Sequence, residues 1–359
     1  MIRLLTLFTL VQFNFNAAAQ ELNDGPYVSY EGDKIVFRSI SAGKMISSTV
    51  PISQKKAAVA KVIFSEHPKW NFTVPLKSTL KEEKSEFSQP EKLLFLSDIE
   101  GEFEGFRSLL IASGVMSESY KWMFGRGHLV ICGDLFDRGT HVPEAMWLLY
   151  KLESLAVKAG GYVHVILGNH DIMNLSGDLR YLQKKYIESA KVMGLDYMSL
   201  YGTESELGRW LRTKNTIEKI GDNLCMHAGV APLINGLKLS VTEINQLCRP
   251  YYDKVKLLRG VGNPAIDPFY TGATSLFWYR GYFSAPKATE EEVNTTLNVF
   301  NVSRIIVGHT IMPGNVGFYY GGKVLGLDVN GHAGDCQAAL FDNGKWIKID
   351  SDGKSMPLQ

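Results

Sequence analysis

Gly133-Asp134-Leu135-Phe136-Asp137-Arg138-Gly139 is the stretch around which this sequence is organised, and the apolar run Leu129-Val130-Ile131-Cys132 comes directly before it. The run predicts a buried strand that delivers two carboxylates and one guanidinium into a loop bounded by glycines. Open α/β sheets bind their ligands at the carboxyl ends of their strands. The stretch therefore predicts a functional loop, provided that other strands end in matching groups.

From Lys92 onward, short apolar runs alternate with segments of helical periodicity. We predict strands at residues 93–96, 128–132, 162–167, 223–226, 304–307 and 323–329, helices at 102–112, 143–159, 242–258 and 290–300, and a closing hairpin at 338–349. This alternation is typical of an α/β layered fold, with sheets flanked by helices.

The chain before Lys92 has a different character. Arg3, an apolar run over residues 4–13 and Ala17-Ala18-Ala19 match a cleaved secretory signal, so we assign residues 1–19 to a signal peptide. Residues 20–90 predict a small β-rich appendage and a linker, with a hairpin at 27–37. Residues 91–359 then form the main domain. We expect an exported protein, periplasmic or secreted, without a stable membrane anchor.

Composition excludes some classes of function. The 359 residues include 38 basic and 37 acidic side chains, a net charge of +1. Such a balance gives no electrostatic footprint for nucleic acid or for an anionic membrane. Four cysteines do not make a disulfide framework for a domain this large, although Cys248 and Cys336 leave the question of one pair open.

Five successive predicted strands each finish in a carboxylate, amide or imidazole beside a glycine. Oxygen and nitrogen donors without cysteine suit two divalent metals such as Mn, Fe or Zn. Two metals about 3.5–4 Å apart need a shared ligand, which a carboxylate can be. We predict Asp134 as the bridge. The other predicted ligands divide between the first metal (Asp98 and Glu100) and the second (Asn169, His227 and His309).

The motifs DxxG, GDxxDRG, GNHD, HAG and GHT occur in this order at residues 98–101, 133–139, 168–171, 227–229 and 308–310. In this order they resemble the calcineurin-like metallophosphoesterases, and GDxxDRG with GNHD resembles their PPP phosphatase branch. The continuation at residues 173–181 is similar to the Shewanella-like protein phosphatases, a group that includes a cold-active protein-tyrosine phosphatase. The resemblance covers about residues 92–342 and implies the layered sandwich of that superfamily, with two central mixed sheets.

The resemblance also implies roles for the remaining polar residues. A metal-bridging hydroxide attacks phosphorus, His170 protonates the leaving oxygen, and Asp137 orients its ring. Arg138 binds the phosphate. Arg280 is the first choice for a second arginine at the phosphate, and Arg180 is the second choice.

Two positions depart from the family pattern. Asp98-Ile99-Glu100 stands where the family has Asp-x-His, and a glutamate favours Mn or Mg over Zn or else leaves the first metal weakly bound. Asp171 replaces the more usual glutamate, and we interpret it as structural.

We therefore expect an exported phosphomonoesterase with two divalent metals, Mn first among them, that dephosphorylates proteins at tyrosine or at serine and threonine. One alternative is a phosphatase of small phosphorylated metabolites or nucleotides. The other is a catalytically impaired module that binds phosphate or phosphopeptides.

Overall fold

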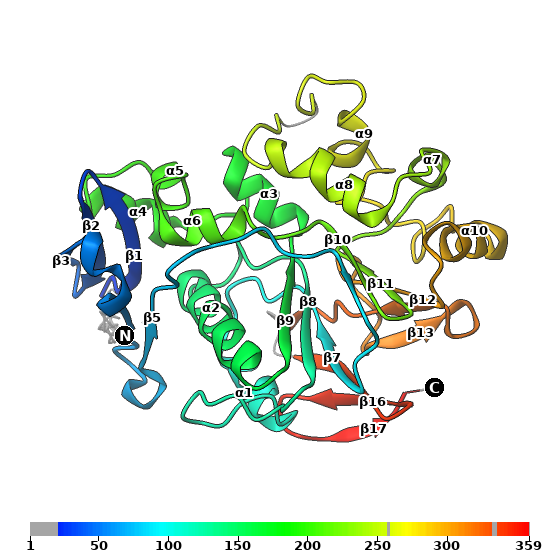
Figure 1. Cartoon of the computed structure of the whole chain (residues 1–359), viewed down its shortest axis with the longest axis horizontal. Helices are drawn as coiled ribbons and strands as arrows, with labels where there is room; N and C mark the ends of the chain where they lie inside the picture. Colours follow the sequence, from blue (N-terminus) through cyan, green and yellow to red (C-terminus); the bar gives the residue numbers. More distant parts are fainter. Residues whose placement is uncertain (1–20, 257–258, 332–335, 359) are drawn as a thin grey trace, which may run out of the picture.

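The computed structural model describes residues 21–256, 259–331 and 336–358. Two six-stranded mixed sheets form its centre (Figure 1). The first has the strand order β17-β16-β15-β7-β8-β9, in which β7, β8 and β9 are parallel. Its strands are β7 (Lys92–Leu96), β8 (His128–Cys132), β9 (Tyr162–Ile166), β15 (Gln337–Asp342), β16 (Lys345–Asp350) and β17 (Ser355–Pro357).

The second sheet has the order β13-β14-β12-β11-β10-β6, with β11, β12 and β14 parallel. Its strands are β6 (Glu86–Phe87), β10 (Ile217–Ile220), β11 (Asn223–Met226), β12 (Arg304–Val307), β13 (Gly317–Tyr319) and β14 (Val324–Gly326). The sequence reasoning missed β6, β10 and β13. Each of them is short, so hydrophobic periodicity had little length on which to act.

The two sheets share one buried core. Alternate residues of β7, β8, β11, β12 and β14 point into it, because successive side chains of a strand face opposite sides. Its members include Phe95, Val130, Cys225, Ile306 and Leu325, all fully buried. Cys132 and Cys225 lie in this core, as expected for small apolar side chains.

Helices cover the outer faces of the sheets. α1 (Phe103–Ala112) and α2 (Val142–Lys158) pack with the first sheet, and α8 (Val241–Cys248) packs against β10. The remaining α-helices are α3 (Asn169–Ser176), α4 (Lys184–Val192), α5 (Tyr197–Leu200), α6 (Glu206–Leu211), α7 (Pro232–Gly236), α9 (Asp267–Tyr270) and α10 (Glu290–Phe300). The predicted helix at 242–258 was too long: α8 ends at Cys248, and Pro250, which lacks an N–H, lies in a short 3₁₀ turn.

The N-terminal strands form a small antiparallel sheet of β1 (Asp24–Glu31), β2 (Lys34–Ser41) and β3 (Lys44–Pro51), beside α2, α4 and α6 (Figure 1). β4 (Val59–Val62) and β5 (Phe72–Pro75) pair separately. The Trp147 indole N–H donates to the Pro26 carbonyl at 2.8 Å and ties the small sheet to α2. β6 joins the second sheet, although it lies in the segment that we interpreted as appendage and linker. The boundary at residue 90 stays a prediction.

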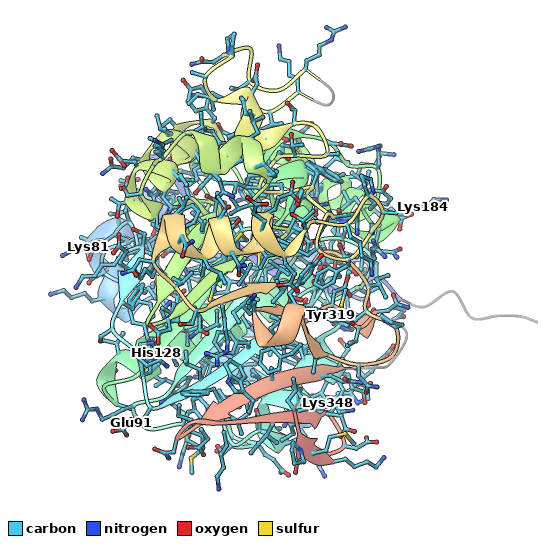
Figure 2. The ribbon with its side chains drawn as sticks, turned by 90° about the vertical axis from the view of Figure 1, so that its right-hand side faces the viewer. Lys81, Glu91, His128, Lys184, Tyr319 and Lys348 are labelled. Atoms are coloured by element: carbon cyan, nitrogen blue, oxygen red, sulfur yellow. The ribbon has the colours of Figure 1, made fainter. Side chains whose placement is uncertain are left out.

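The layered α/β fold with two mixed sheets and a small N-terminal sheet is thus confirmed. Charged side chains project from the rim of the molecule, with Lys81 and Lys184 on opposite sides in Figure 2. Among the described helices, none combines the length and the apolar character that crossing a membrane requires. The predicted signal peptide at 1–19 lies outside the described residues.

Candidate metal and phosphate site

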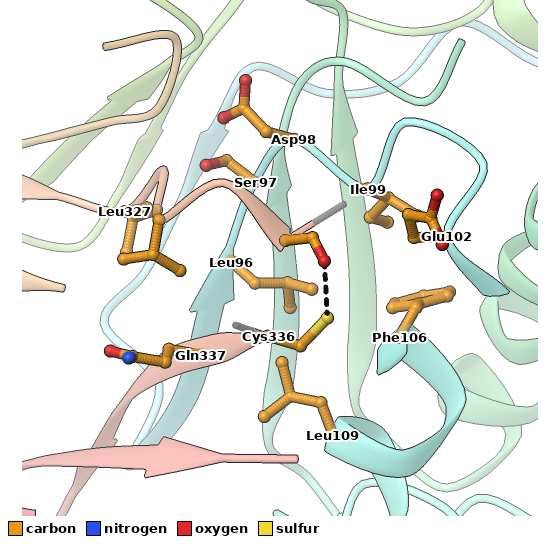
Figure 3. A pocket seen from close by; sticks show the side chains of 12 residues that line it. Leu96, Ser97, Asp98, Ile99, Glu102, Phe106, Leu109, Leu327, Cys336 and Gln337 are labelled. Carbon is orange, nitrogen blue, oxygen red and sulfur yellow. Dashed lines mark hydrogen bonds between the residues drawn. The ribbon is translucent and has the colours of Figure 1, made fainter. Parts of the chain in front are cut away.

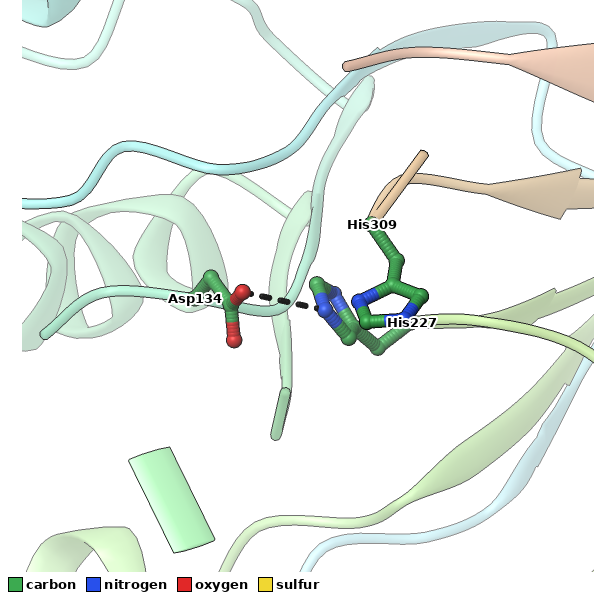
Figure 4. Close-up of side chains that lie close together, drawn as sticks. All are labelled: Asp134, His227 and His309. Carbon is green, nitrogen blue, oxygen red and sulfur yellow. Dashed lines mark ion pairs between the residues drawn. The ribbon is translucent and has the colours of Figure 1, made fainter. Parts of the chain in front are cut away.

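Two groups of buried side chains converge at the carboxyl ends of the central strands. The ligand atoms of Asp134, His227 and His309 all lie within 4.8 Å of one another, and so do those of Glu100, Asp134 and His170. Figure 4 shows the first group, with Asp134 facing His227. Of these five residues, Asp134 belongs to both groups, which is the position that a bridging carboxylate requires.

Asp134 is held on both of its oxygens. Its Oδ1 accepts the backbone N–H of His170 at 2.9 Å, and its Oδ2 lies 3.0 Å from Nε2 of His227. Burial opposes the charge on this carboxylate, but His227 and His170 outweigh it and hold the pKa of Asp134 below its ordinary value. A Cβ at Gly168 would lie 2.1 Å from Oδ1, so the neighbouring backbone must be glycine.

His227 presents one defined nitrogen to the site. Its Nδ1–H donates to the Cys132 carbonyl at 2.8 Å, which leaves Nε2 directed at Asp134 and at Oδ1 of Asn169, 2.8 Å away. Burial disfavours a charged ring, but the carboxylate of Asp134 outweighs burial and raises the pKa of His227 to about 10. A cation between these groups would take the place of that proton.

His309 has a ring nitrogen with no partner. Its Nε2 is buried and accepts no hydrogen bond from any described residue. Burial, together with the nearby charge of His227, holds the pKa of His309 well below its ordinary value, so the ring stays neutral. A neutral, buried and unpaired imidazole nitrogen is available as a metal ligand.

Glu100 and Asp98 bring further negative charge to the site. Burial and the charge of Asp134 raise the pKa of Glu100 to about 10. Burial and the charge of Asp328 raise the pKa of Asp98 to about 8. Carboxylates crowded in this way call for a positive counter-charge, so with the unpaired nitrogen of His309 the residues fit a divalent metal site.

Asp98 differs from the other predicted ligands. Its Oδ2 accepts the backbone N–H of His309 at 3.1 Å. In the described part of the chain it joins neither of the two ligand groups. Its pairing with Glu100 on a first metal therefore stays a prediction.

His170 and Asp137 form a second buried pair. Nδ1–H of His170 donates to Oδ2 of Asp137 at 2.6 Å, which leaves Nε2 facing Glu100 Oε1 at 3.8 Å and Asp134 Oδ2 at 3.9 Å. Burial alone would lower the pKa of His170, but Asp134 and the bond to Asp137 outweigh it and raise the pKa. The ring is thereby prepared to carry a proton beside the metal ligands.

Asp171 shapes the loop that carries the other carboxylates. Its two oxygens accept the backbone N–H groups of Gly168 at 2.7 Å, Leu135 at 2.8 Å and Asp134 at 3.1 Å. The side chain is fully buried and holds the ends of β8 and β9 together. The structural interpretation of Asp171 agrees with these contacts.

The backbone around the site is strained. Thirteen described non-glycine residues have positive φ, and six of them are site residues. Each such residue costs on the order of 1–3 kcal/mol, so the surrounding hydrogen bonds must enforce this geometry. The six are Asp98, Glu100, Asp134, Asp137, Arg138 and His309.

The three candidate arginines occupy different places. Nε of Arg138 donates to Oε1 of Glu100 at 2.8 Å, so it lies directly at the site. Arg280 donates to the carbonyl of His309 at 2.7 Å, whereas Arg180 is paired with Asp178 through two hydrogen bonds. Arg180 and Arg280 line one cavity of about 420 Å³, which also touches Asn169.

Two residues near the site were missed. Nδ2 of Asn174 donates to Asp137 Oδ1 at 2.8 Å. The position of Asn174 in the sequence, one helical turn after His170, could have indicated that it lies on the same side of the helix. Asp328 is buried near Asp98, and the signal was a carboxylate that follows the short strand β14.

The structure also answers whether Cys248 and Cys336 form a disulfide. Cys248 is buried in α8 with a free thiol, so no disulfide joins it to Cys336. Cys336 lies beside a cavity of about 20 Å³ below Ser97 and Asp98, with its Sγ 3.8 Å from the Gly331 carbonyl (Figure 3).

Comparison with known proteins gives consistent matches. Residues 91–313 match the family described as calcineurin-like phosphoesterase. Shewanella-like protein phosphatase 2 of Arabidopsis thaliana is 25% identical over 291 residues, which cover 68% of this chain and 73% of that protein. Shewanella-like protein phosphatase 1 of Plasmodium berghei is 27% identical over 239 residues, 64% of each chain. The crystal structure of the cold-active protein-tyrosine phosphatase of a psychrophilic Shewanella species is 33% identical, with a TM-score of 0.84 over 94% of this chain and 99% of that chain.

Proposed function

Because the chain belongs to the calcineurin-like phosphoesterase family and is a metal-dependent phosphatase, we propose that it is an exported phosphomonoesterase that uses two divalent metals and acts on phosphotyrosine in proteins. The observation that carries this proposal is the arrangement around Asp134. That carboxylate belongs to two groups of possible metal ligands, one with His227 and His309 and the other with Glu100 and His170.

Metal ions bound by Asp134, His227, His309, Asn169 and the carboxylates of Glu100 and Asp98 would supply an activated water and neutralise charge on the phosphoryl oxygens. Mn²⁺ is the first choice, because Glu100 adds a hard oxygen donor. Fe, Zn and Mg are the alternatives.

The protein's own residues act on the phosphate and the leaving group. His170, held by Asp137 through Nδ1, donates a proton from Nε2 to the departing oxygen. Arg138 is placed to contact a phosphate, because its side chain is 38% exposed and its Nε lies 2.8 Å from Oε1 of Glu100, a predicted metal ligand. A pure binding module would need neither the raised pKa of His170 nor its orientation by Asp137.

The cavity beside Asn169 supports an aromatic leaving group. Met173, Tyr270, Phe277 and Trp278 line it, and the Trp278 ring lies edge-on to the ring of His309, 5.8 Å between centroids. A phenyl ring that enters this cavity packs against apolar and aromatic surface next to the metal ligands. Phosphotyrosine is therefore proposed ahead of phosphoserine and phosphothreonine.

Metal analysis and a substrate panel test the proposal. We expect Mn-dependent turnover of phosphotyrosine peptides and aryl phosphates, slower turnover of phosphoserine peptides and nucleotides, and little turnover of bis-aryl phosphates. A preference for nucleotides would favour the metabolite phosphatase. If no divalent metal supported turnover, the enzyme would be reassigned as a binding module.

Export is proposed from the N-terminal pattern alone. Expression of the full chain in a bacterial host, fractionation and mass measurement test it. We expect a mature protein that begins at Gln20 in the exported fraction, and a full-length protein retained in the cytoplasm would refute the proposal.

A further inference from the structure

A chain of buried hydrogen bonds extends from His170 away from the metal ligands. Nδ1–H of His170 donates to Oδ2 of Asp137 at 2.6 Å, and Oδ1 of Asp137 accepts Nδ2 of Asn174 at 2.8 Å. The Tyr197 hydroxyl then donates to Oδ1 of Asn174 at 2.7 Å. All four residues are at most 5% exposed, so water competes little for these bonds.

Asn174 joins this chain to the catalytic pair. It lies one helical turn after His170 in α3, and its amide nitrogen donates both to Asp137 and to the His170 carbonyl, 3.0 Å away. Both N–H groups of the amide are therefore used within the site. The Asp137 carboxylate is thereby fixed relative to the helix that carries the His170 ring.

Tyr197 determines which way the Asn174 amide points. An amide turned the other way round would present its oxygen to Oδ1 of Asp137, and two acceptors repel each other. The Tyr197 hydroxyl favours the observed orientation, because it donates to the amide oxygen. Burial raises the pKa of Tyr197 well above its ordinary value, so the hydroxyl keeps the proton that it donates.

Tyr197 is itself held in place by α5 and by aromatic packing. α5 packs against strand β1 of the small N-terminal sheet (Figure 1). The Tyr197 ring lies edge-on to the ring of Tyr201, with 5.9 Å between centroids. Tyr201 in turn lies edge-on to Phe136 at 4.7 Å and to Tyr27 of β1 at 6.2 Å. Because Phe136 directly precedes Asp137, this packing holds the hydroxyl beside the loop that carries the carboxylate.

We propose that Tyr197 and Asn174 are positioning residues for the proton donor of the reaction. The Tyr197 hydroxyl fixes the Asn174 amide, and the amide holds the Asp137 carboxylate. The carboxylate then directs the His170 ring so that Nε2 is presented to the leaving oxygen. This inference rests on the proposed function, because it concerns how the proton reaches the leaving group.

Tyr197→Phe tests the proposal, because it keeps the packed ring and removes only the hydroxyl. The measurement is kcat/KM for a series of substituted phenyl phosphates at saturating Mn²⁺, with metal content measured on each protein. We expect turnover of phenyl phosphate to fall about 2- to 12-fold, the equivalent of one neutral hydrogen bond, and turnover of p-nitrophenyl phosphate to change by less than about twofold. The dependence of kcat/KM on the acidity of the leaving phenol should therefore be steeper in the variant than in the original protein.

A second variant and a matched control complete the experiment. Asn174→Leu removes the amide at similar side-chain volume, and it should steepen the same dependence at least as much. Tyr252→Phe is the control, because it removes another buried tyrosine hydroxyl, one that donates to the Lys214 carbonyl at 2.9 Å. It should leave the dependence on the leaving group unchanged.

Equal losses on all substrates, or an unchanged dependence on the leaving group in both Tyr197→Phe and Asn174→Leu, would overturn the inference while the proposed function stands. Loss of metal from both variants would also overturn it, because the two residues would then support the metal site instead. If the original protein hydrolysed no phosphoester with any divalent metal, the proposed function itself would fail, and this inference would fail with it.

Discussion

Replacement of Asp137 by asparagine tests the role of His170 as proton donor independently of metal binding. Asp137 is fully buried, accepts Nδ1–H of His170 at 2.6 Å and accepts Asn174 Nδ2 at 2.8 Å. Its φ is +74°, a conformation that asparagine tolerates, so Asp137→Asn should retain the loop. The change removes the negative charge that favours the protonated ring of His170.

The size of the effect follows from that one hydrogen bond. A bond to a charged group contributes about 1.5–3 kcal/mol, equivalent to about 10- to 150-fold in rate. We expect kcat/KM for phenyl phosphate, whose leaving oxygen needs a proton, to fall by this amount. Turnover of p-nitrophenyl phosphate, whose leaving group departs more readily as an anion, should change much less.

The assay compares the two substrates at saturating Mn²⁺, with metal content measured on each protein. Asp253→Asn is the matched control, because Asp253 pairs with Arg212 away from the catalytic groups. Equal losses for both substrates with full metal content would refute the role of Asp137 through His170. Loss of metal would show that Asp137 supports the metal site instead.

Three further changes test the site and the core. Asp134→Asn should reduce metal content from about two ions per chain to near zero, measured by mass spectrometry, because both ligand groups lose their shared member. Glu100→His should shift the preferred metal from Mn toward Zn, and unchanged activation by a metal series would exclude Glu100 as a ligand. Lys214→Met should lower the free energy of unfolding by about 3 kcal/mol in urea titrations, because Lys214 lies 2.6 Å from buried Glu153, which then keeps Lys77 as its cation and the Trp210 N–H as a donor. Burial opposes the charge of Glu153, but Lys214 and Lys77 outweigh burial and lower its pKa below 4.5. The difference in unfolding free energy between the original protein and Lys214→Met should therefore be fully present above about pH 4.5, and it should shrink as the pH falls below that value.

Local sequence was sufficient for much of the site. Strands at residues 128–132, 223–226 and 304–307 were predicted with their observed bounds, since each is a compact apolar run followed by glycine or histidine. His227 and His309 follow two of these strands, and Glu100 and His170, which also lie around Asp134, follow the strands predicted at 93–96 and 162–167. Short strands such as β10 and β13 were not predicted. Their extended conformation depends on pairing with a neighbouring strand, β11 or β14, and their own sequences show no clear alternation of apolar and polar residues.

The sequence by itself determined which chemical groups stand at the ends of the strands, because a buried run followed by a polar loop is a local pattern. Only the tertiary structure decided which of those groups meet. Asp134 belongs to both ligand groups, Asn174 reaches Asp137, and Asp328 lies near Asp98, because two sheets pack face to face and bring distant strand ends together.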